Sequence, residues 1–158
     1  MAFEFSANDV FVMAEQMERN GADFYKKASE EVGDPESKKL LGDLATMEEM
    51  HEKTFGQMKT ELSDQEKQQT VFDPDGESAL YLRALADTRV FFEKEIDLSS
   101  KEGIFKAAIE AEKDSIVFYL GMKEAVPENL GKNRLEHIIK EEMKHVRILS
   151  NELTSLKR

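Results

Sequence analysis

The feature that most constrains the fold of this chain is an internal repeat. Residues 15–58 align without a gap on residues 109–152, at a constant offset of 94 positions. The residues that coincide include Glu18/Glu112, Phe24/Phe118, Tyr25/Tyr119, Glu30/Glu124, Leu41/Leu135, Glu48/Glu142 and His51/His145. The chain therefore contains two copies of one unit, and its chemically most specific residues are among those that the copies share.

Each copy has the pattern of two long helices. Apolar residues recur at intervals of three and four rather than two, and 8 Gly and 3 Pro in 158 residues offer few points at which a helix would break. Ser6 with Asp9, and Ser99 with Glu102, have the spacing of capping boxes. Asp34 directly before a proline is typical of an N-cap. The sequence predicts helices over residues 7–32, 35–62, 100–126 and 128–156.

The connections between these helices predict the architecture. Short turns join the first helix to the second and the third to the fourth, whereas residues 63–99 form a long crossover that we expect to contain short helix. Two helical hairpins joined by a long crossover are typical of an all-α, ferritin-like four-helix bundle. We expect residues 1–158 to form a single domain of this kind.

The composition argues against several classes of partner and site. A formal net charge of -11 makes nucleic acid and anionic membranes poor partners, because both attract basic surfaces. The sequence has no cysteine, which excludes disulfides, thiolate metal sites and FeS4 centres. The acidic start of the chain does not resemble a signal peptide, and no apolar run approaches the roughly 20 residues of a membrane span. We expect a cytoplasmic protein.

Each of the four predicted helices carries a glutamate on its apolar face. Glu48 with His51, and Glu142 with His145, form two Glu-x-x-His motifs, whose members lie one helical turn apart. Apolar residues share these faces and those of the glutamates on the other two helices, Glu18 and Glu112; they include Phe11, Tyr25, Leu41, Leu44, Phe55, Phe105, Ile116, Tyr119, Leu135, Ile138 and Leu149. A bundle would gather these glutamates and histidines in its interior.

Four carboxylates in an apolar interior are costly as anions, and two divalent cations would balance their charge. One histidine for each metal suits iron or manganese. The predicted metal ligands are Glu18, Glu48, His51, Glu112, Glu142 and His145. The alternative is a duplicated scaffold whose buried glutamates are protonated or salt-bridged. The two motifs, each 30 residues after a core-facing glutamate, favour the metal site.

Nearby residues allow simpler interpretations. Tyr25 and Tyr119 are equally consistent with core packing and with a hydrogen-bonding or redox role beside the site. His137 aligns with Asp43 in the other copy, so we interpret it as a surface histidine. Glu49 has no acidic counterpart and is predicted to be a charge on the flank of its helix.

The segments "MERNGADFYKKA", "MEEMHEKTF", "AEKDSIVFYLGM" and "KEEMKHVRIL" resemble the rubrerythrin family of ferritin-like di-iron proteins, in its branch without a rubredoxin module. The resemblance covers nearly the whole chain, and all six predicted ligands match. It implies two iron ions, with manganese as the alternative, no haem, and reduction of hydrogen peroxide or dioxygen. Alternatives are an iron-binding ferroxidase or storage protein of bacterioferritin type, and a metal-bound module without turnover.

Two departures from the family matter. Without cysteine the chain has no rubredoxin module, so the resemblance implies a separate electron-donor protein such as a rubredoxin. Rubrerythrins usually have an additional glutamate one turn from the ligand on the third helix, where this chain has Ile109 and Ser115 beside Glu112. Glu15, one turn before Glu18, is either a seventh ligand or a surface acid. We expect a homodimer.

Overall fold

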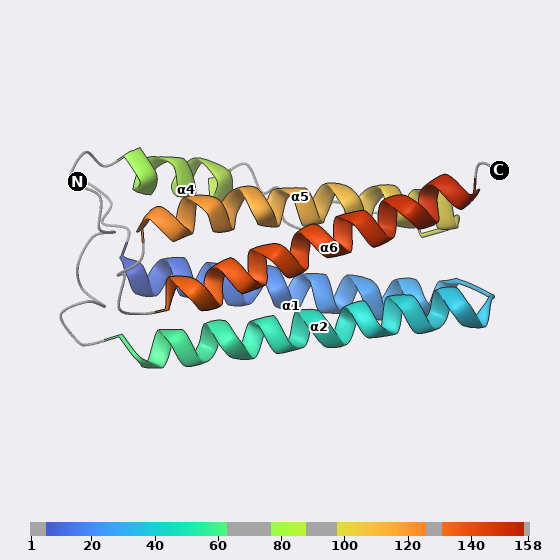
Figure 1. The fold of residues 1–158 in the computed structure, drawn as a ribbon, viewed down its shortest axis with the longest axis horizontal. Coiled ribbons are helices and arrows are strands. Elements are labelled where there is room, and N and C mark those ends of the chain that lie inside the picture. The colour runs from blue at the N-terminus through green and yellow to red at the C-terminus, as the bar shows by residue number, and fades with distance from the viewer. Residues whose placement is uncertain (1–5, 63–76, 88–97, 126–130, 157–158) are drawn as a thin grey trace.

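The computed structural model describes residues 6–62, 77–87, 98–125 and 131–156. Five helices occur in these ranges: α1 (Ala7–Glu31), α2 (Pro35–Thr60), α4 (Glu77–Asp87), α5 (Lys101–Ala125) and α6 (Lys132–Leu156). Helix α1 packs against α2 and α5 against α6, and the four long helices run lengthwise along the molecule (Figure 1). The predicted all-α bundle of two helical hairpins is confirmed. None of the described helices is long and apolar enough to cross a membrane.

Local capping determines where two of these helices begin. The Ser6 side chain accepts a hydrogen bond from the Asp9 amide at 3.1 Å, and Asp9 accepts one from the Ser6 amide at 3.0 Å, which completes the predicted capping box of α1. Asp34 accepts from the Ser37 amide at 3.0 Å and caps α2 as predicted. At the start of α5 the Gly103 amide donates to the Ser100 hydroxyl at 3.0 Å, one position after the predicted pair of Ser99 and Glu102.

Helix α6 begins a few residues later than the sequence predicts. Gly131 has a φ of 84°, a conformation that only glycine adopts without strain, and α6 starts at the next residue. The predicted end of the third helix at residue 126 and the predicted start of the fourth at residue 128 both lie outside the described residues. The other helix bounds agree with prediction to within two residues.

The crossover contains a helix, as expected. Helix α4 lies against α5, where the Tyr81 hydroxyl donates to the Val117 carbonyl at 3.2 Å (Figure 1). The approach is close at Gly121, since a Cβ there would lie 2.6 Å from the Tyr81 ring. Leu82 of α4 is completely buried in the core. Helix α4 therefore covers one part of the bundle that holds the site.

The bundle core consists of two apolar clusters with a polar layer between them. One cluster includes Phe11, Met17, Phe55, Phe118, Tyr119, Leu135 and Ile139, and the other includes Phe24, Tyr25, Leu41, Leu44, Ile104, Phe105 and Leu149. Along each long helix, the residues that separate the clusters include one of the predicted glutamates. The core thus encloses the polar layer from both sides and keeps it away from solvent.

Candidate metal centre

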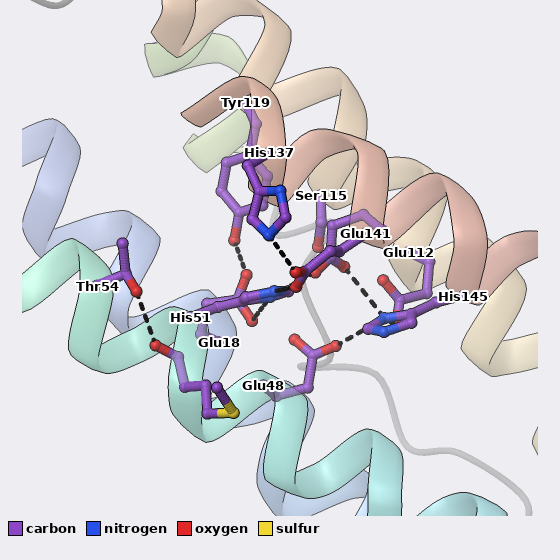
Figure 2. A network of polar contacts seen from close by, with 12 residues as sticks. Glu18, Glu48, His51, Thr54, Glu112, Ser115, Tyr119, His137, Glu141 and His145 are labelled. Atoms are coloured by element: carbon purple, nitrogen blue, oxygen red, sulfur yellow. Dashed lines mark hydrogen bonds and ion pairs between the residues drawn. The ribbon is translucent and has the colours of Figure 1, made fainter. Parts of the chain in front are cut away.

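The structure brings all six predicted ligand residues together in the polar layer. One comes from α1, two from α2, one from α5 and two from α6: Glu18, Glu48, His51, Glu112, Glu142 and His145. Each is at most 3% exposed to solvent. The two histidine rings lie nearly parallel, with 6.1 Å between their centres. The duplicated motifs therefore meet at one site in the middle of the bundle (Figure 2).

The potential ligand atoms form two overlapping groups. The first, which we call the His51 position, consists of Glu18, Glu48, His51 and Glu142. The second, the His145 position, consists of Glu48, Glu112, Glu142 and His145. Within each group the ligand atoms lie within 4.8 Å of one another. Because Glu48 and Glu142 belong to both groups, their carboxylates are placed to be shared between two metal ions.

Several buried nitrogen and oxygen atoms in this layer, all of which could bind a metal, lack hydrogen-bond partners in the described part of the chain. They are Nδ1 of both histidines and oxygens of all four glutamates: Glu18 Oε2, Glu48 Oε1, His51 Nδ1, Glu112 Oε2, Glu142 Oε1, Glu142 Oε2 and His145 Nδ1. Leaving a buried polar group unsatisfied costs about 1–3 kcal/mol, and metal coordination would satisfy all of them. Four carboxylates and two imidazole nitrogens, without thiolate, fit divalent iron or manganese. The residues present therefore fit a di-metal centre.

The imidazole nitrogens approach the carboxylates closely. Nδ1 of His51 lies 2.7 Å from Glu142 Oε1 and 3.5 Å from Glu18 Oε2. Nδ1 of His145 lies 3.4 Å from Glu112 Oε1 and 3.5 Å from Glu48 Oε1. Both Nδ1 atoms thus face the centre of the cluster, as metal-binding nitrogens must.

The electrostatics of the site also favour a cation. Burial, together with the other carboxylates, raises the pKa of Glu48 and of Glu142 well above the ordinary value. Burial lowers the pKa of His51, but the nearby carboxylates of Glu142 and Glu18 outweigh it and raise that pKa to about 11. The metal-free cluster therefore retains protons at neutral pH, and these are the protons that metal binding would displace.

Two tyrosines connect the two hairpins at the site. The Tyr25 hydroxyl of α1 donates to Glu112 Oε1 of α5 at 2.6 Å, and the Tyr119 hydroxyl of α5 donates to Glu18 Oε1 of α1 at 2.5 Å. Both rings are completely buried, and burial raises both pKa values well above the ordinary value. The tyrosines therefore combine the two interpretations open to them, packing in the core and donating to carboxylates. A redox role for them stays a prediction.

Glu141 is a residue of the site that the sequence did not reveal. Its Oε2 lies 2.5 Å from Nε2 of His51, and its Oε1 lies 2.6 Å from Nε2 of His137 (Figure 2). Burial raises the pKa of Glu141, but the hydrogen bond to His51 and the charge of His137 bring it below the ordinary value. The repeat could not have identified this residue, because Met47 occupies its place in the other copy.

The remaining candidates lie outside the two metal positions. Glu15 points to Lys59, with Oε1 and Nζ 2.5 Å apart, and belongs to neither group, so the structure does not show it as a seventh ligand. Glu49 pairs with Lys26 at 2.5 Å on the flank of α2, as predicted. The His137 side chain is 73% exposed, as predicted for a surface histidine, although it contacts Glu141.

A surface pocket reaches the edge of the site at His51. It lies between α2 and α6, has a volume of about 390 Å³, and is lined by Met50, His51, Thr54, Gln57, Asn133, Arg134, His137, Ile138 and Glu141. The outer wall includes Met50, which is 55% exposed, whereas His51 is 3% exposed. The pocket therefore extends from the surface to one histidine of the cluster.

Comparison with known proteins agrees with this geometry. Residues 6–59, which contain α1 and nearly all of α2, match the family model described as Rubrerythrin. The crystal structure of a proposed ferritin-like diiron-carboxylate protein from Thermotoga maritima superposes with a TM-score of 0.73, at 23% sequence identity and over 98% of each chain. At this identity the likeness establishes a ferritin-like fold. A search among curated proteins gives no significant match.

Proposed function

We propose that this chain, whose first hairpin matches the Rubrerythrin family model and whose fold is ferritin-like, is a di-iron oxidoreductase that reduces hydrogen peroxide or dioxygen. The observation that carries the proposal is the overlap of the two buried ligand groups, which share Glu48 and Glu142. A shared pair of carboxylates is the arrangement that suits a reaction requiring two electrons from two adjacent metal ions.

The residues divide into unshared and shared ligands. Glu18 and His51 would hold one iron, Glu112 and His145 the other, and Glu48 and Glu142 both. Two ferrous ions, when bound, supply the two electrons that, with two protons, convert hydrogen peroxide to two water molecules. The apolar clusters on both sides exclude bulk water from the layer. The tyrosine hydroxyls hold Glu18 and Glu112 in place from the opposite hairpin.

The pocket beside His51 is the route that we propose for the substrate. Peroxide and dioxygen are far smaller than its volume of about 390 Å³, and the pocket ends at a histidine of the cluster. The electrons would come from a separate donor protein such as a rubredoxin, because the sequence has no cysteine with which to hold an iron–sulfur centre. A cytoplasmic location suits such a donor. A homodimer stays a prediction, which size-exclusion chromatography would test.

The decisive experiment is an anaerobic reaction with peroxide. Metal-free protein is loaded with Fe²⁺, its metal content is measured, and it is mixed with hydrogen peroxide in a stopped-flow spectrometer, with dioxygen in a parallel series. We expect the loaded protein to oxidise faster than free Fe²⁺ and faster than the Glu142→Gln variant, which lacks a shared ligand. If the protein reacts no faster than free iron, the proposal fails. Uptake of many irons per chain with oxidation by dioxygen would instead indicate the ferroxidase alternative.

A further inference from the structure

The two metal positions differ in what supports their histidines. Nε2 of His51 lies 2.5 Å from Glu141 Oε2. The ion pairs of His145 in the described ranges all involve Nδ1, and none of them involves Nε2. The difference originates in the sequence, because Met47 stands in the first copy where Glu141 stands in the second. The duplicated site is therefore symmetric in its ligands and asymmetric behind them.

A carboxylate behind a histidine changes how well that histidine binds metal. A carboxylate that accepts from Nε2–H keeps the proton there, so Nδ1 presents its lone pair to the metal. The contact also fixes the orientation of the ring and makes the imidazole a stronger donor. His51 has its Nδ1 directed at Glu18 and Glu142 and so meets these conditions.

Glu141 is itself held in place for this contact. His137, one helical turn earlier on α6, contacts its other oxygen at 2.6 Å. The Glu141 side chain is 24% exposed, and that of His51 is 4% exposed. A partly buried contact of this kind is weakened less by solvent than an exposed ion pair. The carboxylate is therefore positioned before any metal binds.

We propose that Glu141, acting through His51, makes the two metal positions unequal, so that the His51 position binds a divalent metal more tightly than the His145 position. Glu141 is a positioning residue and not a ligand. The inference rests on the metal centre of the proposed function but not on its peroxide chemistry. The more tightly held ion is then the one beside the surface pocket, since His51 and Glu141 both line it.

The test is a calorimetric titration of the metal-free full-length protein with Co²⁺. We expect two binding steps of different affinity in the wild type. Glu141→Gln, which keeps the shape of the side chain and removes its charge, should weaken the tighter step by about 10–100-fold and leave the other unchanged. The matched control is Glu49→Gln, since Glu49 adjoins the shared ligand Glu48 as Glu141 adjoins Glu142. Within the described residues, the ion pair of Glu49 is with the exposed Lys26 side chain, away from the cluster, so both steps should stay unchanged.

Two further backgrounds assign the effect to one histidine. In His145→Ala the His51 position keeps its histidine, and adding Glu141→Gln should weaken the remaining binding. In His51→Ala the same addition should change nothing, whereas a merely structural role of Glu141 would weaken binding in both backgrounds. If either alanine variant does not fold, as judged by circular dichroism, the corresponding glutamine variant replaces it.

The outcomes separate this inference from the proposed function. Two equal steps in the wild type, an unchanged titration of Glu141→Gln, or the same loss in both backgrounds would overturn the inference. A wild-type protein that binds no Co²⁺ would overturn the metal centre and with it the proposed function. A protein that binds Co²⁺ unequally but does not react with peroxide would leave the inference standing and remove the function.

Discussion

The hydroxyl of Tyr119 on α5 donates a hydrogen bond to Glu18 on α1, 101 positions earlier in the sequence, at 2.5 Å. Tyr25 and Glu112 make the same contact in the opposite direction at 2.6 Å. Each hairpin thus supplies the donor that holds a carboxylate of the other. The Glu18 and Glu112 carboxylates each accept a hydrogen bond from a tyrosine of the other hairpin. This arrangement of the site therefore requires both copies of the repeat to fold together.

Tyr25→Phe and Tyr119→Phe should each destabilise the metal-free protein more than the metal-bound protein. Removing the hydroxyl leaves a buried carboxylate with one donor fewer, at a cost of about 1–3 kcal/mol. Metal would satisfy the same carboxylate and reduce that cost. Urea unfolding with and without Fe²⁺ under anaerobic conditions measures both values. Tyr81→Phe, which removes an exposed hydroxyl bonded to the Val117 carbonyl, is the control. A loss equal to that of the control would contradict the assigned role.

The six residues of the cluster could be predicted because two independent regularities converge on them. Helical periodicity places Glu48 and Glu142 among apolar residues, and the repeat singles them out from neighbours such as Glu49, which has no acidic counterpart. Buried charge then requires a cation for balance. These arguments need no knowledge of how the helices cross, and the structure brings the six residues together.

What could not be predicted depends on packing between helices distant in sequence. The contact of Glu141 with His51 joins α6 to α2 across 90 positions, and the repeat gave no sign of it, since Met47 is its counterpart. The hydrogen bonds of the tyrosines likewise depend on how α1 lies against α5. Helix α6 starts at Lys132 rather than at the predicted residue 128, because the sequence does not show that Gly131 adopts a left-handed conformation directly before the helix.

Substitution of a shared ligand should damage both metal positions, whereas substitution of an unshared one should damage one. Glu142→Gln is expected to weaken both steps of a Co²⁺ titration, because its carboxylate belongs to both groups. Glu18→Gln should weaken only the step assigned to the His51 position, and Glu112→Gln only the other. Elemental analysis after dialysis gives a second measurement. Equal effects of Glu142→Gln and Glu18→Gln would show that the carboxylates are not shared.

The metal-free protein should lose stability as pH rises from 6.5 toward 11. His51 has an ordinary pKa of 6.5 and a folded pKa of about 11, so its contribution is complete below 6.5 and is lost as pH rises toward 11. Glu48 and Glu142 also have raised pKa values, so their contributions are complete below 4.5 and decrease with rising pH. Glu112, whose pKa falls to about 2, acts in the opposite direction only below 4.5.

Thermal melting across this pH range tests the effect. The melting temperature of the metal-free protein should fall, and the stabilisation by added metal should grow, because metal replaces the protons that the cluster loses. His51→Gln is the matched variant, and its melting temperature should fall less steeply. A metal-free melting temperature that rises over this range would contradict the electrostatic account of the cluster.

Filling the surface pocket should slow the reaction with peroxide without removing metal. Thr54 lines the pocket beside His51, and its hydroxyl donates to the Met50 carbonyl at 3.1 Å. Thr54→Trp should therefore decrease the second-order rate constant for peroxide in stopped-flow measurements, while the metal content stays that of the wild type. Thr46→Trp is a close control, because Thr46 lies on the same helix, makes the equivalent bond to the Gly42 carbonyl at 3.2 Å, and does not line the pocket. If both tryptophan variants react at the wild-type rate, substrate reaches the cluster by another route.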